Sequence, residues 1–370
     1  MRKLRFVKGI MPSALMAALC CASAEGQQQS EHDLNYWSQA LKSRITLNGY
    51  AQAGYTYTHY DGRETNTLDV KRTLLWAKAR VTDRWSLLFM HDFNSQVQEF
   101  YTDLRVTRGK GLTIRFGQFK NQLSLENPLS PTTMELIDVY SQGVTYLTGC
   151  GSDPLFGIQY GRDLGIDFYG QLFNDHLFYN IEVMNGRGIN QKDKDNKKDI
   201  IVRLDYRPVA GLRLVASAQK GYGTSLVASS VYIPAANAIA LGQTYRRDRW
   251  TAGFEYKTGQ NDYWQHRCAS VHGEVMGGRD GKTRSWGAYL TGCVPVGGGL
   301  DAVASYDYFN YAKGFGLDRH MVYCGLQYWF FTKCRVQLQY TWSSSWTDGL
   351  NTAWIDHPAS RLQIQTQVAF

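Results

Sequence analysis

The chain has 370 residues and a formal net charge of +8, with 44% hydrophobic residues, 14% aromatic residues, 36 glycines and only 8 prolines. It contains no run of about 18 or more apolar residues, which excludes transmembrane helices. The sequence has no basic stripe, zinc-finger spacing or RNA-binding signature, so nucleic acid is not an expected partner. This length predicts either two domains or one large all-β unit.

Residues 1–24 have the pattern of a secretory signal peptide. An apolar stretch at residues 10–21 is followed by Ala22-Ser23-Ala24, a small-residue cleavage site. An amphipathic first helix is the alternative, and Leu19 before Cys20 argues against a lipoprotein signal. Cleavage would begin the mature chain at Glu25 and lower the net charge from +8 to +4, because the leader holds four basic residues and no acidic one. Those basic residues are Arg2, Lys3, Arg5 and Lys8.

The cysteines indicate neither a disulfide framework nor a metal site. Two of the seven leave with the leader, and an odd, widely spaced set without a CxxC pair remains. We expect no metal and no cofactor. The remaining cysteines are Cys150, Cys268, Cys293, Cys324 and Cys334.

After a polar N-terminal segment at residues 25–43, the chain alternates apolar and polar residues with a period of two. In residues 44–57 the apolar face includes Ile45, Leu47 and Ala51, and the other face includes Tyr50 and Gln52. A half-buried soluble strand gives the same alternation. Length separates the two interpretations, because a tilted membrane-spanning strand needs about 9–11 residues and a typical globular strand about 5–6.

About sixteen such segments follow between residues 44 and 370, and their connections alternate in length. The short connections are predicted at residues 82–84, 107–111, 174–175, 207–211, 258–261, 295–299 and 332–333. The other set, mostly longer, is predicted at residues 61–66, near Ser95, and at 120–154, 186–198, 223–246, 277–281, 310–318 and 346–359. This pattern predicts an all-β fold, a transmembrane antiparallel β-barrel with short periplasmic turns and longer external loops. The expected location is the bacterial outer membrane, with lipid as a partner and residues 25–43 as a periplasmic segment.

The last segment predicts an assembly signal at Phe370. Leu362, Ile364, Val368 and Phe370 lie on one face of the final alternating strand. This resembles the signature read by the outer-membrane barrel-insertion machinery, which we therefore expect as a partner.

The sequence also resembles the phosphate-selective porin O and P family. The resemblance covers about a third of the chain, and it implies a sixteen-stranded, usually homotrimeric barrel that passes small anions such as phosphate. Known members carry two arginines and a small residue where this chain has Lys71-Arg72-Thr73. The matched family positions place Arg72 and Asp92 in the pore. The resemblance is carried by residues 47–52, 70–73, 85–93, 116–119, 123–126, 161–165 and 185–188.

Alternation predicts that many charged side chains point into the lumen, where charge near a constriction selects ions. The expected basic residues are Arg44, Arg80, Arg105, Arg115, Arg203, Arg213, Arg249, Lys257, Arg335 and Arg361. The expected acidic residues are Asp92, Asp103, Asp167, Glu182, Asp205, Glu255, Asp301 and Asp307. A ladder of arginines could pass anions; alternatively, each arginine pairs with a carboxylate and stiffens the wall. The specific hypothesis is a ladder of Arg72, Arg105 and Arg115, supported by Lys120.

The connection at residues 120–154 is expected to fold into the lumen as a constriction, with Lys120 and Glu126 at the eyelet. A short helix is predicted at residues 132–139. A plain surface loop is the alternative, because connections of this length are either functional or disordered.

The sequence predicts no enzyme and no catalytic residue. Ser217 and Ser270 lack a GxSxG setting, and His266 and His272 are too far apart for a tight metal site. The predicted function is passive diffusion of small solutes with anion, including phosphate, preference. The alternatives are a non-selective general porin, a barrel-based surface binding protein and an outer-membrane hydrolase.

Overall fold

The computed structural model describes residues 43–150, 152–153, 157–158, 161–193, 196–224, 243–259, 268–347, 354–355 and 357–370. The predicted signal peptide (residues 1–24), residues 25–42 of the N-terminal segment, and His266 lie outside the described residues. No helix in the described ranges is long and apolar enough to cross a membrane.

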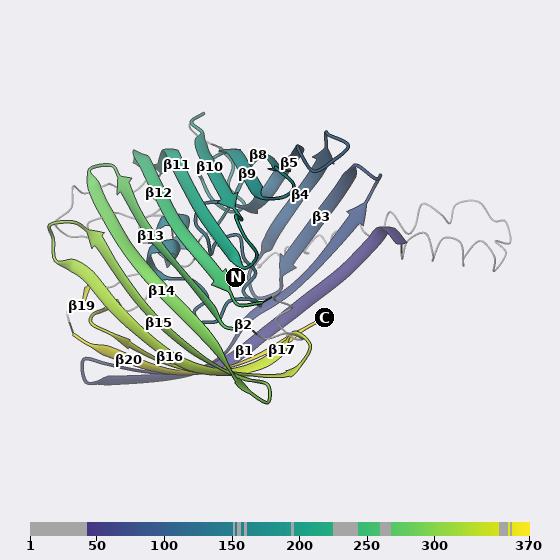
Figure 1. Cartoon of the computed structure of the whole chain (residues 1–370). Helices are drawn as coiled ribbons and strands as arrows, with labels where there is room; N and C mark the ends of the chain where they lie inside the picture. The colour runs from purple at the N-terminus through teal and green to yellow at the C-terminus, as the bar shows by residue number, and fades with distance from the viewer. Residues whose placement is uncertain are drawn as a thin grey trace, which may run out of the picture. The chain divides into compact units, whose positions relative to one another are not determined.

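Sixteen antiparallel strands form a closed barrel, which confirms the predicted fold class (Figure 1). The seam closes where β1 pairs with β20, from Tyr50 opposite Ala369 to Tyr60 opposite Ala359. Two small sheets lie within connections: β6 (Ser152–Asp153) with β7 (Gly157–Ile158), and β18 (Trp346–Thr347) with β19 (Trp354–Ile355). The barrel strands are β1 (Ile45–Tyr60), β2 (Arg63–Arg80), β3 (Trp85–Asp92), β4 (Val97–Arg105), β5 (Thr113–Lys120), β8 (Arg162–Leu172), β9 (Leu177–Met184), β10 (Asp199–Tyr206), β11 (Leu212–Thr224), β12 (Thr244–Lys257), β13 (Ser270–Asp280), β14 (Thr283–Gly297), β15 (Leu300–Ala312), β16 (Leu317–Phe331), β17 (Cys334–Ser343) and β20 (Ala359–Ala369).

Side chains alternate across the wall because successive residues of a strand point to opposite faces. In β10, Ile200 and Leu204 face outward with 51% and 48% exposure, while Arg203 and Asp205 face inward with 1% each. The outward face is therefore apolar and the inward face mainly polar, as the sequence predicts. Ile201 is an inward apolar exception and is also 1% exposed.

The connections at one edge of the barrel are generally shorter than those at the other, here called the short-link edge and the long-link edge. The short-link edge has residues 81–84, 106–112, 173–176, 207–211, 258–269, 298–299 and 332–333. The long-link edge has residues 61–62, 93–96, 121–161, 185–198, 225–243, 281–282, 313–316 and 344–358.

Several predicted connections differ from the structure. Those predicted at residues 277–281, 295–299 and 310–318, for example, are the shorter links 281–282, 298–299 and 313–316. The link predicted at residues 61–66 is a two-residue turn, because Asp61 and Gly62 both have positive φ (47° and 69°) and close a tight hairpin. The link predicted at residues 258–261 is longer, because β12 ends at Lys257 and β13 begins at its partner Ser270; the described residues between them are 258–259 and 268–269. Cys268 consequently lies outside a strand, whereas Cys324 lies within β16.

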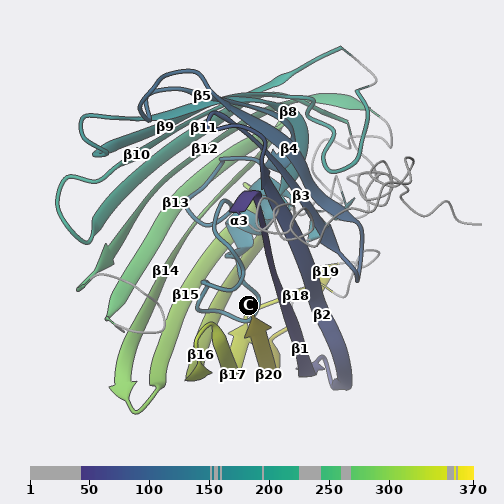
Figure 2. The ribbon, with the colours of Figure 1, turned by 90° about the vertical axis from the view of Figure 1, so that its right-hand side faces the viewer.

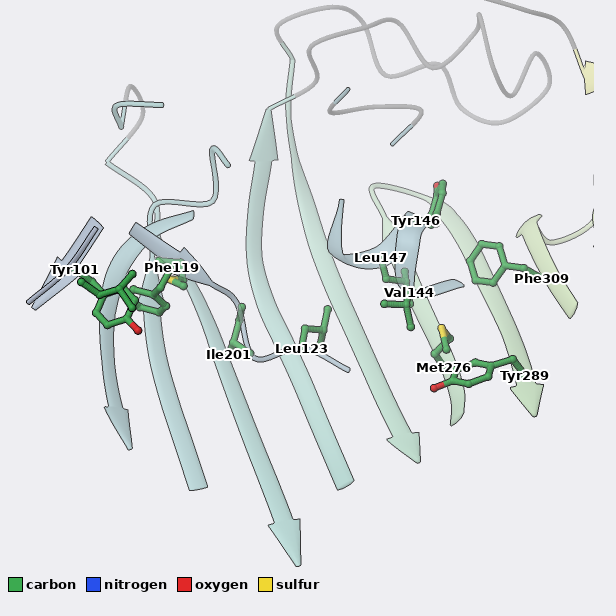
Figure 3. Packing of buried hydrophobic residues seen from close by; sticks show 12 residues of the cluster. Tyr101, Phe119, Leu123, Val144, Tyr146, Leu147, Ile201, Met276, Tyr289 and Phe309 are labelled. Carbon is green, nitrogen blue, oxygen red and sulfur yellow. The ribbon is translucent and has the colours of Figure 1, made fainter. Parts of the chain in front are cut away.

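Residues 121–161 join β5 to β8 and are here called the third loop; its described residues fold into the barrel as predicted. Figure 2 shows the loop's helix, α3 (Gln142–Thr148), inside the ring of strands. In Figure 3, Val144 and Leu147 of this helix face Met276, and Tyr146 lies near Phe309. These contacts bury apolar loop side chains against apolar residues of the inner wall.

The helix predicted at residues 132–139 is wrong. That segment consists of turns, whose backbone groups bond to the barrel wall: Gln339 accepts from Ile137 N at 2.8 Å, and Arg335 donates to Met134 O at 2.7 Å. A helix would need those groups for its own hydrogen bonds. The helix begins later, after Ser141, whose hydroxyl accepts from Val144 N at 3.4 Å.

Candidate functional site

The third loop is hydrogen-bonded to one side of the barrel wall. Ser217 of β11 accepts from Ser124 N at 2.8 Å, and Asp307 of β15 accepts from Gln142 N at 2.7 Å. Between them, Glu274 of β13 accepts from Leu125 N at 2.9 Å. These contacts fix the loop against β11–β15 and leave space on the opposite side of the lumen.

Three inward arginines hold the backbone of this loop. Arg203 donates to Ser124 O, Arg249 donates to Leu147 O, and Arg335 donates to Met134 O. All three were expected to face the lumen, and they do. Their donors bind loop carbonyls, and Arg249 and Arg203 also form ion pairs with Asp280 and Asp205.

Asp138 anchors the loop to the strand that closes the barrel. Its carboxylate lies 2.7 Å from Arg361 Nη2 and accepts from Gln363 Nε2 at 3.1 Å. Burial by itself raises the pKa of Asp138, but Arg361 and then Lys71 outweigh burial, and the pKa lies below its ordinary value. This carboxylate is therefore ionised at neutral pH and holds the loop through charge.

A cavity of about 420 Å³ lies between the loop and the opposite wall. Each of the strands β1 to β5 and the start of β8 contribute to it, and Tyr140 and Cys150 line it from the loop side. Its basic residues are Lys71, Arg72, Lys120 and Arg162, and its acidic residues are Asp69 and Asp92.

Three of these basic side chains are not paired with a carboxylate. In the described part of the chain, Lys71, Arg72 and Lys120 form no ion pair. Arg72 donates to Gln52 Oε1 at 3.0 Å, and Lys120 Nζ donates to Leu129 O at 2.6 Å. Because an amide or carbonyl oxygen carries no net charge, these partners leave the positive charges uncompensated.

Arg162 and Asp92, two of the other charged residues that line the cavity, have partners. Arg162 lies 2.9 Å from Glu99. Asp92 is 4% exposed, and its carboxylate accepts from Thr73 N at 3.0 Å and Asn94 N at 3.1 Å. Two backbone donors thus fix the position of the Asp92 carboxylate at the end of β3.

The structure brings together three of the six pore residues proposed from the sequence. Arg72, Asp92 and Lys120 line the same cavity. Arg105 is exposed at the end of β4, at the short-link edge.

Arg115 and Glu126 occupy other positions. Arg115 forms a two-pronged pair with Asp103, at 2.8 and 3.1 Å, and its guanidinium lies 3.9 Å from the ring centre of Tyr101. Glu126 is 1% exposed, accepts from Ser141 N at 2.8 Å and lies 3.4 Å from His272 Nε2. Arg115 therefore belongs to the wall and Glu126 to the contact between loop and wall.

Several cavity residues were not among the candidates from the sequence. Lys71 precedes Arg72, and alternation would place the two on opposite faces, yet both line the cavity. Arg162 stands at the start of β8, where strand periodicity gives little information. Tyr50 could have been found, because it lies on the inward face predicted for residues 44–57.

No protein-family model and no curated protein matches the chain. Among solved structures, it is similar to the anion-selective porin from Comamonas acidovorans, with a TM-score of 0.61 and 15% identity over 88% of this chain and 99% of that one. It is also similar to Pseudomonas putida OprB, with a TM-score of 0.64 and 10% identity over 94% and 99%. It is similar as well to a trimer form of OmpT from Vibrio cholerae, with a TM-score of 0.57 and 14% identity over 88% of this chain and 100% of that one. The chain therefore has the barrel fold of these outer-membrane proteins.

Proposed function

We propose that the protein is an outer-membrane porin through which small solutes diffuse passively, with a preference for anions such as phosphate. The observation that carries this proposal is the cavity beside the third loop, where Lys71, Arg72 and Lys120 form no ion pair with any described carboxylate.

The outer face of the barrel supports its placement in a lipid bilayer. A closed sheet pairs its backbone groups internally, which a bilayer requires. The outward residues include Trp85 with 47% exposure, Phe116 with 63% and Leu290 with 50%. We infer that the short-link edge faces the periplasm, as in barrels with short periplasmic turns and longer external loops. The predicted signal peptide, assembly into a homotrimer and the role of the insertion machinery belong to this proposal.

The cavity has the chemistry to favour an anion. Fixed positive charge near a narrow passage raises the local concentration of anions. A guanidinium offers planar donors that suit phosphate or carboxylate, and an ammonium acts as a point charge. Four basic residues and two acidic residues, Asp69 and Asp92, line the cavity, so positive charge exceeds negative charge there. The Comamonas acidovorans porin, which is similar in fold, is described as anion-selective.

We propose diffusion without catalysis. The buried His272 lies 3.4 Å from Glu126 and its ring centre lies 5.7 Å from that of Tyr289. This arrangement fastens the third loop to β13 and β14. The inward carboxylates Glu274 and Asp307 likewise accept hydrogen bonds from loop amides.

The test is electrical recording of the purified full-length protein in planar lipid bilayers. We expect discrete conductance steps, a reversal potential of the sign given by anion preference, and a chloride current that falls when phosphate is added. Absence of conductance would overturn the proposal that the protein is a channel. Conductance with equal permeability to both ions would instead identify a general porin.

A further inference from the structure

An apolar groove of about 550 Å³ lies on the outer face of β11–β14, towards the long-link edge. Register places Gly277 directly between Trp250 and Trp286, whose side chains are 50% and 47% exposed. A Cβ atom on Gly277 would lie 2.9 to 3.0 Å from the indole of Trp250. The glycine thus allows this indole to lie flat against the sheet and form the floor of the groove.

A row of basic residues borders this floor on the same outer face, at the next outward-facing position of each strand towards the long-link edge. The register aligns Lys220, Asp248, Arg279 and Arg284 across four neighbouring strands. Lys313 extends the row, because its backbone N donates to Arg284 O at 2.8 Å. We call Lys220, Arg279, Arg284 and Lys313 the basic row.

The basic row has little negative charge around it. Asp248 is the acidic residue of the groove lining, and it already lies 2.9 Å from Arg246 Nε. Arg279 donates to the backbone oxygen of Gly281 at 2.9 Å. Within the described ranges, Lys220, Arg284 and Lys313 form no ion pair. The row therefore carries several uncompensated positive charges directly above an aromatic surface.

We propose that this surface binds a lipid whose headgroup carries phosphate, with its acyl chains along Trp250 and Trp286 and its phosphates among the basic row. The inference rests on the bilayer placement proposed above, which puts the long-link edge in the outer leaflet. Indoles suit the boundary between acyl chains and headgroups, and clustered basic residues recognise phosphorylated headgroups. Along the strands, the apolar floor is followed by the basic row towards the long-link edge. An amphiphilic lipid has the same order, with acyl chains followed by a charged headgroup. A free anion would use the border alone.

The first test measures lipid binding to the detergent-purified full-length protein by native mass spectrometry. The probes are a glycolipid with two phosphates, lipid A, and the same lipid after enzymatic removal of both phosphates. We expect the phosphorylated lipid to bind at least about tenfold more tightly, as charge-assisted hydrogen bonds imply. Equal binding of the two lipids would overturn the proposal, as would an equal occupancy by inorganic phosphate in the absence of lipid.

Matched variants locate the site. Arg284→Glu should reduce binding of the phosphorylated lipid by about tenfold or more. Arg63→Glu makes the same charge change at the same edge, in β2, and should leave binding unchanged. Gly277→Val keeps every charge but displaces the Trp250 indole, and should weaken binding of both lipids. If Arg284→Glu changes the oligomeric state and not lipid binding, the face contacts a second copy and the proposal fails.

Conductance separates this inference from the proposed function. These substitutions lie on the outer face, so each variant should keep the conductance of the wild type. If the wild type binds the phosphorylated lipid but conducts no ions, the proposed channel function is wrong and the proposed lipid site is supported. Conduction without preferential lipid binding would contradict only the lipid site.

Discussion

Cys150 lies at the boundary between the third loop and the basic cavity. Its thiol donates to Asn127 Oδ1 at 2.7 Å and lies 2.8 Å from the hydroxyl of Thr148. Burial raises the pKa of this thiol to about 11, although the hydrogen bond with Thr148 acts in the opposite direction. The thiol is therefore protonated at neutral pH, and because the thiolate is the nucleophile, its reactivity depends on pH.

We predict that thiol-specific methanethiosulfonate reagents lower the conductance through Cys150. The rate should rise about tenfold per pH unit between pH 7 and 10, because the thiolate fraction grows in that proportion below the pKa. An anionic reagent should react faster than a cationic one of similar size, since the cavity is basic. The current is recorded during reagent addition. An unchanged response in Cys150→Ala, or a rate independent of pH, would contradict this prediction.

At the scale of elements, the third loop divides the inward charges into two groups. On one side, Arg203, Arg249 and Arg335 bind the loop backbone, and on the other side Lys71 and Arg72 face the cavity. The first group determines where the loop lies, and its position leaves the second group accessible. In the proposed channel, the size of the passage therefore depends on residues that do not line it.

We predict that Arg335→Ala widens the passage. Loss of its donation to Met134 O and Gln327 Oε1 removes charge-assisted hydrogen bonds, each contributing about 1.5–3 kcal/mol. Single-channel recordings should show a larger and noisier conductance than those of the wild type. Arg213→Ala is the control, because Arg213 pairs with Asp205 and Glu255 in the wall. Equal effects of the two substitutions would show that Arg335 has no special role in holding the loop.

The sequence could predict that the loop enters the lumen but not where it lies. The alternation of residues assigns Arg203 and Arg335 to the inner face. It cannot tell an arginine that binds the loop from one that lines the passage, because both face inward. The missing information is tertiary, because it depends on which wall the loop covers. The sequence did contain one signal of the loop's position. The inward positions of Ile201, Met276 and Phe309 are apolar on a mainly polar face, and these residues pack under the loop.

At the scale of the whole molecule, the barrel depends on the seam between β1 and the end of the chain. Phe370 N donates to Gly49 O at 3.0 Å, and Gly49 N donates to Phe370 O at 3.3 Å. The Phe370 ring lies against Gly49, where a Cβ would approach its Cζ to 2.7 Å. The ring itself is 65% exposed on the outer face. Phe370 thus completes the seam and, in the proposed membrane placement, presents an apolar side chain to the bilayer.

We predict that Phe370→Asp lowers the amount of protein inserted in the outer membrane several-fold. The substitution places a charge on the lipid-facing end of the seam and alters the proposed assembly signal. Phe331→Asp is the control, because Phe331 is 71% exposed at the same edge but lies in β16, away from the seam. Quantitative blots of membrane fractions compare the two. Normal levels of the Phe370 variant would contradict an assembly role.

The fold as a whole was more predictable than the site. Strand number and the alternation of links follow from a period of two and from segment length, which are local properties. The cavity combines side chains from β1 to β5, β8 and the loop, so it appears only once the barrel closes. Arg105 and Arg115 illustrate the limit. The alternation of residues could predict that both side chains point inward. The pairing of Arg115 with Asp103 could not be predicted, because it depends on the register of β4 with β5.

We propose that the cavity, and not a ladder along β4 and β5, sets ion preference. The measurement is the reversal potential across a salt gradient for the wild type, for Lys71→Gln with Arg72→Gln, and for Arg105→Gln with Arg115→Gln. At physiological salt the screening length is about 8 Å, so two charges inside a narrow cavity still act on a passing ion. We expect an anion-preferring wild type, a potential shifted towards zero in the first pair and little change in the second. Cation preference in the wild type, or a shift confined to the Arg105 and Arg115 pair, would contradict this account.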